Sequence, residues 1–162
     1  MASPMAQVCL VTGAAGFIGS HLSERLLQDG YRVIGVDCFT DYYPRAVKER
    51  NLAALRGQPG FTLLEQDLGS MDLPALLDGV SYVFHQAAQA GVRASWGASF
   101  AIYTDLNILN TQKLLEAARG VPTLKRFVYA SSSSVYGDSN VLPLVESALP
   151  QPVSPYGVTK LA

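Results

Sequence analysis

The sequence predicts an α/β protein with a doubly wound parallel sheet, in which helices cover both faces of the strands. Short apolar runs alternate along the chain with longer segments whose apolar residues recur at helical spacing. The strand-like runs are apolar at successive positions, as expected for strands that are buried on both faces. Strands and helices that alternate in this way are typical of a parallel sheet.

The individual elements are expected in the following order. The strands are Val8–Val11, Tyr31–Val36, Phe61–Leu64, Val80–His85 and Arg126–Ala130. The helices are Phe17–Gln28, which Asp29-Gly30 ends, Arg45–Arg56, a short helix at Leu73–Leu77, and Leu106–Ala118. Prolines 143, 150, 152 and 155 indicate a loop, and Ser154 is placed to cap a last helix.

Length and composition exclude several classes of protein. The chain has 162 residues, 49% of them apolar, which is enough to bury the core of one domain. The net charge is 12 − 13 = −1, so we expect no nucleic-acid partner. No apolar run reaches the roughly 18–20 residues that cross a bilayer, and no signal peptide is evident, so we expect no membrane partner. Cys9 and Cys38 lie in apolar runs and are expected to be buried, reduced thiols of a cytoplasmic protein.

A glycine-rich segment, Thr12–Gly19, stands between the first strand and the first helix. Its glycines have the spacing G-x-x-G-x-x-G. Glycine there allows a tight turn and lets backbone N–H groups approach a pyrophosphate, whose charge the helix N-terminus favours. The segment therefore predicts a Rossmann-type dinucleotide site. Its expected cofactor-binding residues are Gly13, Ala15, Gly16, Phe17, Ile18 and Gly19.

Further candidate cofactor residues follow the second, third and fourth strands. The Asp37 carboxylate can accept hydrogen bonds from the adenosine ribose and would repel a 2′-phosphate, and no cation is evident beside it. These features favour NAD over NADP. Asp67 and Leu68 follow the strand at whose edge the adenine would lie, and the small Ala87 and Ala88 would let a cofactor approach the backbone. A solvated turn aspartate and ordinary packing alanines are the alternatives.

A serine run and a Tyr–Lys pair predict the chemistry. Ser131–Ser134 follow the fifth strand, and Tyr156 and Lys160 share a face of the last helix. A lysine ammonium favours the phenolate of a nearby tyrosine, although moving the tyrosine pKa from about 10 to 7 requires roughly 4 kcal/mol. Such a tyrosine can remove the proton of a substrate hydroxyl while hydride passes to NAD. A serine can orient the same oxygen.

Together these residues resemble the extended short-chain dehydrogenase/reductase superfamily. The resemblance rests on Thr12–Gly19, Asp37, Asp67-Leu68, Ala87-Ala88, the serine run followed by Val135-Tyr136-Gly137, and the pair Tyr156 and Lys160. Within the superfamily, Asp41-Tyr42-Tyr43 and the stretch from Ala87 to Arg93 are most similar to NAD-dependent nucleotide-sugar epimerases, particularly UDP-glucuronate 4-epimerases.

The resemblance implies a role for each candidate residue. Tyr156 would be the base and Lys160 its partner, both also binding the cofactor, and Ser132 would be the catalytic serine, with a neighbouring serine as the alternative. Ser132, Ser133, Tyr156 and Arg93 would contact the nucleotide sugar, although Arg93 is equally interpreted as a solvated loop residue. The implied reaction oxidises the sugar at C4, lets the 4-keto sugar rotate, and reduces its other face. No metal is implied.

Alternative reactions stay open at this point. Related 4,6-dehydratases and decarboxylases resemble this pattern but have acidic residues directly after the catalytic serine or threonine, where this chain has Ser133 and Ser134. Epimerisation is therefore favoured over dehydration, decarboxylation or net reduction. A non-catalytic NAD-binding module is the alternative from another class, and the intact Ser132, Tyr156 and Lys160 set argues against it.

The last expectations concern the length of the chain and three residues with aromatic rings, His85, Trp96 and Phe100. The C-terminal portion of the family, which forms the nucleotide-sugar pocket, is expected to be absent. Residues 1–162 would then form a truncated NAD-binding Rossmann-type domain that binds NAD weakly or not at all and has no turnover by itself, whereas the full-length form would be a homodimer. His85 is expected to be a core residue, and Trp96 and Phe100 are expected to pack.

Overall fold

The computed structural model describes residues 6–139 and 142–162. The chain divides into two compact units, which we describe separately. The first unit contains Met1–Ala87 and Lys113–Tyr129, and the second contains Ala88–Gln112 and Ala130–Ala162. No helix among the described residues is long and apolar enough to cross a membrane.

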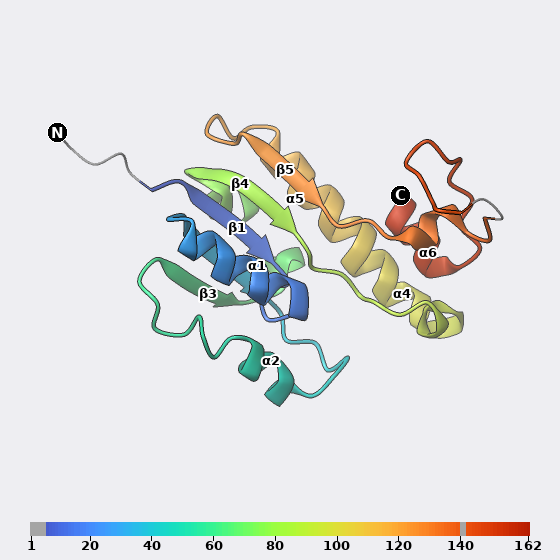
Figure 1. Ribbon diagram of the computed structural model, residues 1–162, viewed down its shortest axis with the longest axis horizontal. Coiled ribbons are helices and arrows are strands. Elements are labelled where there is room, and N and C mark those ends of the chain that lie inside the picture. Colours follow the sequence, from blue (N-terminus) through green and yellow to red (C-terminus); the bar gives the residue numbers. More distant parts are fainter. Residues whose placement is uncertain (1–5, 140–141) are drawn as a thin grey trace. The chain divides into compact units, whose positions relative to one another are not determined.

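The first unit holds a five-stranded sheet with the order β3-β2-β1-β4-β5 (Figure 1). Its strands are β1 (Val8–Thr12), β2 (Arg32–Asp37), β3 (Phe61–Glu65), β4 (Val80–His85) and β5 (Arg126–Tyr129). All neighbouring strands are parallel, and the order changes direction on either side of β1. This is the doubly wound parallel sheet predicted from the sequence. Four of the five predicted strands differ from the observed ones by one residue at one or both ends.

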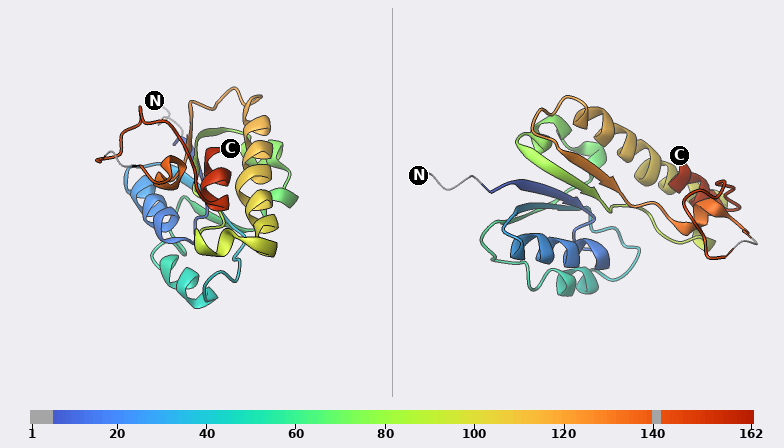
Figure 2. Two further views of the ribbon diagram at one scale, coloured as in Figure 1. Left: turned by 90° about the vertical axis from the view of Figure 1, so that its right-hand side faces the viewer. Right: turned by 45° about the horizontal axis from the view of Figure 1, so that its top comes forward.

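Helices cover both faces of this sheet. On one face lie α1 (Phe17–Gln28) and α2 (Arg45–Asn51), which run along the same side in Figure 2. On the other face pack α3 (Leu73–Leu77) and the Lys113–Ala118 part of α5 (Asn110–Ala118). Successive strand residues face opposite sides, so that Cys9 and Val11 pack with Leu26 of α1, whereas Leu10 packs with Leu114 of α5. Burying each large apolar side chain contributes roughly 1.5–3 kcal/mol.

Two sequence-based expectations about the first unit are wrong. The predicted helix Arg45–Arg56 ends at Asn51, because Leu52 and Leu55 turn inward and are fully buried with Ala15 in a small apolar cluster. Cys38 is exposed, since it follows β2 in the connection to α2, outside the sheet. Cys9 lies inside β1 and is buried as predicted.

The second unit contains most of a longer helix than the sequence predicted. The helix starts at α4 (Phe100–Tyr103), continues through the π-helical segment Thr104–Leu109, and passes into α5. The expected start at Leu106 is therefore six residues too late, since the helix begins at Phe100, directly after the short turn Gly97–Ser99. The last helix, α6 (Pro155–Leu161), begins where expected, and the Ser154 hydroxyl accepts a hydrogen bond from the Gly157 N–H at 3.0 Å.

Candidate active site

The loop between β1 and α1 is packed so closely that a side chain would not fit at Gly13 or at Gly19. Gly13 has a φ of +69°, and a Cβ atom there would lie 2.9 Å from the backbone nitrogen of Ala87. A Cβ atom on Gly19 would overlap the Gly13 carbonyl oxygen. Glycine at these two positions lets the loop pass directly beside the carboxyl end of β4 and lets α1 start directly behind the loop.

The first turn of α1 has no side-chain cap. Its N-cap residue, Gly16, makes no side-chain capping bond, and Phe17 and Ile18 are 73% and 63% exposed. The first N–H groups of any α-helix have no acceptor within the helix, and the helix dipole places partial positive charge there. The start of α1 is therefore suited to an anion such as a phosphate.

Asp37 is held from three sides at the end of β2. Its Oδ2 accepts a hydrogen bond from the Ala15 N–H at 3.1 Å, and its Oδ1 accepts one from the Phe39 N–H at 2.8 Å. The Lys48 ammonium also donates to Oδ1 at 2.9 Å, and both side chains of this ion pair are 6% exposed. Sequence reasoning missed Lys48, because one lysine in a predicted helix, eleven residues from its partner, shows no motif.

The other candidates of the first unit lie along the same edge of the sheet. Asp67 follows β3, is exposed, and accepts a hydrogen bond from the Gly69 N–H at 3.0 Å. The Leu68 side chain is buried in the core, so a role in binding would fall to its backbone. Ala87 follows β4, and its N–H donates to the Thr12 hydroxyl at 3.1 Å. The carboxyl edge of a doubly wound sheet is the usual place for a ligand.

His85 belongs to the core, as predicted. It is 1% exposed, and its Nδ1 lies 2.7 Å from the Thr12 hydroxyl oxygen. Among the described residues, no group of three His, Cys, Asp or Glu side chains is placed to bind a metal ion.

In the second unit, α6 packs directly on the serine run. A Cβ atom on Gly157 would lie 2.6 Å from the Ser134 carbonyl oxygen, so only glycine allows this approach. The Ser131 hydroxyl donates to the Lys160 carbonyl oxygen at 3.3 Å. The Ser132 hydroxyl accepts from the Ser134 N–H at 3.2 Å and so caps the short 3₁₀ turn Ser133–Tyr136. These contacts bring the serine run and the Tyr–Lys helix together.

The ring of Tyr156 is held by a second tyrosine. The rings of Tyr156 and Tyr103 meet edge to face with centroids 6.3 Å apart, and the Tyr156 N–H donates to the Ser95 hydroxyl at 3.0 Å. Tyr103 is 1% exposed, and its own hydroxyl lies 2.9 and 2.8 Å from the carbonyl oxygens of Ala90 and Gly91. The position of Tyr156 on α6 is thus fixed by buried neighbours.

Asn107 is a buried residue of this unit that sequence reasoning missed. Its amide oxygen accepts from the Gln89 N–H at 2.7 Å, and its amide nitrogen donates to the Gln89 carbonyl at 3.1 Å and the Thr159 hydroxyl at 3.0 Å. Asn107 lies in the π-helical segment, a feature often found at functional sites. Its hydrogen bonds therefore link the segment after β4 to Thr159 of α6. Thr159 lies between Tyr156 and Lys160 in the sequence.

We expect Asn107→Leu to lower the free energy of unfolding by about 2–4 kcal/mol, because the buried Gln89 backbone groups and the Thr159 hydroxyl lose their partner. Urea unfolding measures this change. Asp105→Asn, at an exposed position of the same segment, is the control and should stay within about 0.5 kcal/mol of wild type. Equal stability of the two variants would contradict the role of Asn107.

Lys160 is also buried, with 5% of its surface exposed. Removal from water disfavours its charged form and lowers the pKa of the ammonium group from 10.5 to about 8. At neutral pH most molecules still carry the charge, so Lys160 can act as a cation and a hydrogen-bond donor.

The buried charge of Lys160 predicts a pH-dependent effect of Lys160→Met. Below pH 8 the lysine is protonated in both the folded and the unfolded chain, and the folded chain bears the full cost of burial. Between about pH 8 and 10.5 only the unfolded chain stays protonated, so that cost disappears as the pH rises. We expect the stability of wild type minus that of the variant to increase over this range by up to roughly 3 kcal/mol. Urea unfolding at pH 7 and pH 10 measures the difference, and a constant value would contradict the expectation.

The remaining candidates of the second unit are exposed. Ala88 follows β4, and Arg93 starts the short 3₁₀ turn Arg93–Ser95. Trp96, which we expected to pack, is 60% exposed and stands between the short turns Arg93–Ser95 and Gly97–Ser99. That expectation is therefore wrong.

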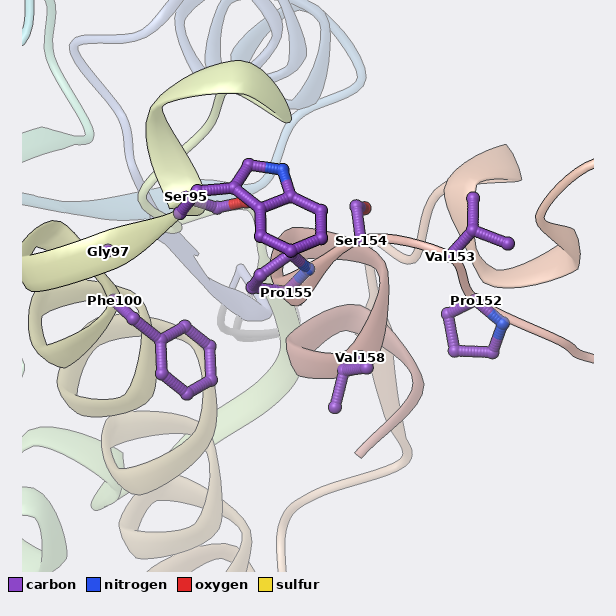
Figure 3. Close-up of a pocket in the computed structure, with 9 residues that line it drawn as sticks. Ser95, Gly97, Phe100, Pro152, Val153, Ser154, Pro155 and Val158 are labelled. Atoms are coloured by element: carbon purple, nitrogen blue, oxygen red, sulfur yellow. The ribbon is translucent and has the colours of Figure 1, made fainter.

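Trp96 lines a groove of about 510 Å³ beside the start of α6. Phe100, Pro155 and Val158 stand along it in Figure 3. Its full lining is Ser95, Trp96, Gly97, Phe100, Pro152, Val153, Ser154, Pro155 and Val158. Because Ser132, Tyr156 and Lys160 are not among these residues, we do not assign the groove to the reacting group.

Comparison with known proteins connects these features to a family. Residues 10–162 match the family described as GDP-mannose 4,6 dehydratase. The chain belongs to this family. The match confirms the resemblance to nucleotide-sugar enzymes of the short-chain dehydrogenase/reductase type that the motifs predicted.

Individual relatives are similar over nearly the whole chain. A protein described as an uncharacterized UDP-glucose epimerase YtcB of Bacillus subtilis (strain 168) is 49% identical over 94% of this chain and 48% of its own length. A probable UDP-glucuronate 4-epimerase of Rhizobium meliloti (strain 1021) is 38% identical over 93% of this chain and 45% of its own length. The chain thus spans about half the length of these curated relatives.

A solved structure is similar in fold as well as in sequence. The UDP-glucuronic acid 4-epimerase from Bacillus cereus, in complex with UDP-glucuronic acid and NAD, superposes with a TM-score of 0.92 at 45% identity. The match covers 96% of this chain and 49% of that protein. It confirms the Rossmann-like parallel fold.

Proposed function

We propose that this chain holds the NAD-binding and catalytic residues of a nucleotide-sugar 4-epimerase that converts UDP-glucuronate to UDP-galacturonate. The observation that supports this most directly is the close packing of α6 on the serine run, which gathers Ser132, Tyr156 and Lys160 in one unit. The similarity to the Bacillus cereus UDP-glucuronic acid 4-epimerase supports the choice of substrate.

The first unit fits a dinucleotide. The uncapped start of α1 suits a pyrophosphate, and at the carboxyl edge of the same sheet Asp37 ends β2 and Asp67 follows β3. In this proposal the first unit binds the cofactor through Gly13, Ala15, Gly16, Phe17, Ile18, Gly19, Asp37, Asp67, Leu68 and Ala87. The candidate cofactor residues of the second unit are Ala88, Tyr156 and Lys160. When bound, NAD would supply the hydride acceptor and donor that a change of configuration at C4 of the sugar requires.

The residues of the second unit would control the proton. The Tyr156 phenolate would remove the proton of the C4 hydroxyl and give it back when the sugar is reduced. The Lys160 ammonium would supply a positive charge on the same face of α6, and Ser132 would orient the C4 oxygen by a hydrogen bond. The exposed guanidinium of Arg93 would pair with the sugar carboxylate or a phosphate, with Ser133 as a further contact.

The neutral residues after Ser132 support epimerisation over the other reactions of the family. Dehydration and decarboxylation require additional proton transfers, for which a carboxylate next to the catalytic serine is suited. Ser133 and Ser134 occupy those positions and have no acidic group.

We further propose that the complete protein is a cytoplasmic homodimer. Two free cysteines, one exposed, suit a reducing compartment. Ile102 and Leu109 are 41% and 46% exposed on the helix that begins at Phe100, where a second subunit would cover them.

Proton NMR tests the proposed reaction. The complete gene product is incubated with UDP-glucuronate and a catalytic amount of NAD, and the anomeric and C4 proton signals of the sugar are followed. Formation of UDP-galacturonate without net NADH is the expected result. Unchanged UDP-glucuronate would overturn the substrate assignment, and a dehydrated or decarboxylated sugar would overturn epimerisation.

A further inference from the structure

Lys48 is a buried cation beside the carboxylate of Asp37. From the sequence alone, no cation was expected beside this carboxylate. Its Nζ lies 2.9 Å from Oδ1 of Asp37 and 5.4 Å from the ring centroids of both Phe39 and Tyr43. The ammonium therefore faces one carboxylate and two aromatic rings, all in the first unit. Such rings attract a cation but do not neutralise it.

This ion pair changes the usual electrostatic argument for NAD. A carboxylate at the end of β2 is expected to reject NADP because it repels the 2′-phosphate. Here the charges of Asp37 and Lys48 sum to zero within one buried pair. Rejection of NADP then depends mainly on the ion pair in which Asp37 engages the Lys48 ammonium. Repulsion of the 2′-phosphate by a net negative charge contributes less.

A second cation lies nearby but is already paired. The Arg45 guanidinium stands 4.2 Å from the centroid of the Phe39 ring and binds both carboxylate oxygens of Glu65, at 2.5 and 2.7 Å. Its side chain is 53% exposed. A substitution at Asp37 would leave the Arg45–Glu65 pair intact, so Lys48 is the cation that such a change would release.

We propose that Lys48 is a specificity-determining residue of the dinucleotide site, a cation able to bind the 2′-phosphate of NADP that Asp37 keeps engaged. The inference rests on the dinucleotide site of the proposed function. Asparagine at position 37 would have the shape of aspartate without its charge, and the Lys48 ammonium would then pair with a phosphate. A charge-assisted hydrogen bond of this kind contributes enough to change affinity by about 10- to 100-fold.

Binding constants of four proteins test the proposal. The dissociation constants of NAD and NADP are measured by calorimetry for the complete gene product as wild type, Asp37→Asn, Asp37→Asn/Lys48→Met and Asp37→Asn/Arg45→Met. We expect Asp37→Asn to shift the NADP-to-NAD affinity ratio about 10- to 100-fold toward NADP. Lys48→Met should remove that gain, and the matched control Arg45→Met should preserve it.

The outcomes separate this inference from the proposed function. A wild type that binds neither dinucleotide would overturn both. A wild type that binds NAD, with a ratio that Asp37→Asn does not move or that Lys48→Met does not restore, would overturn the inference alone.

If Asp37→Asn does not fold because its buried Lys48 is unpaired, the single variant Lys48→Met tests the same ion pair from the other side. Lys48→Met leaves the Asp37 charge unopposed, so its binding of NADP should weaken about tenfold further relative to NAD. Thermal unfolding shows which variants fold. An unchanged ratio in a folded Lys48→Met protein would also overturn the inference.

Discussion

Tyr156→Phe should lower kcat for the epimerisation of UDP-glucuronate by about 10²- to 10⁴-fold and weaken NAD binding by no more than about tenfold, the effect of one lost hydrogen bond. The substitution removes only the hydroxyl group that would exchange a proton with the sugar. Phenylalanine keeps the ring that meets Tyr103 edge to face and the backbone N–H that donates to Ser95, so α6 should keep its place. The NMR assay measures turnover, and calorimetry measures the affinity for NAD.

Tyr31→Phe is the matched control for this experiment. Tyr31 also meets a second tyrosine edge to face, Tyr82, but it precedes β2 at the amino end of the sheet. Its loss of a hydroxyl should leave kcat within about twofold of wild type. If Tyr156→Phe also turned over at the wild-type rate, Tyr156 would not be the base. A complete gene product that binds NAD equally well with and without the Tyr156 hydroxyl but turns over no sugar would instead be a non-catalytic dinucleotide-binding module.

The parallel sheet and the positions of its strands could be predicted because they depend on local pattern. Strands covered on both faces need apolar residues at successive positions, and Val8–Thr12 and Val80–His85 show this directly. The glycine loop and the Tyr156–Lys160 spacing are likewise local. Each could be recognised without knowing what lies beside it in space.

The features that sequence reasoning missed depend on distant partners. Lys48 matters because of Asp37, eleven residues away, and Asn107 because of Gln89, eighteen residues away. Neither side chain belongs to a spaced motif. The early end of α2 has the same cause, since Leu52 leaves the helical path to pack against Ala15. Tertiary contacts therefore determine the structure at the positions where helix propensity and the spacing of apolar residues did not predict it.

Gly19→Ala should lower the affinity for NAD by at least about 100-fold and the free energy of unfolding by about 1–3 kcal/mol. The added methyl carbon would overlap the Gly13 carbonyl oxygen and lie 2.8 Å from its carbon and 3.0 Å from Cα of Ala14. All of these are backbone atoms, which cannot move aside as a flexible side chain can. The loop would have to open, and the N–H groups at the start of α1 would lose their common direction.

Two other glycines make the test of Gly19 specific. A Cβ atom on Gly120 would meet nothing within 4 Å, so Gly120→Ala should stay within about 0.5 kcal/mol of wild type and bind NAD normally. At Gly16 the nearest atom would be the Gly13 carbonyl oxygen at 3.1 Å, so Gly16→Ala should have an intermediate effect. Urea unfolding and calorimetry measure both quantities. If Gly19→Ala lost stability but kept its affinity for NAD, the loop would have a packing role alone, and the phosphates would have to be bound elsewhere.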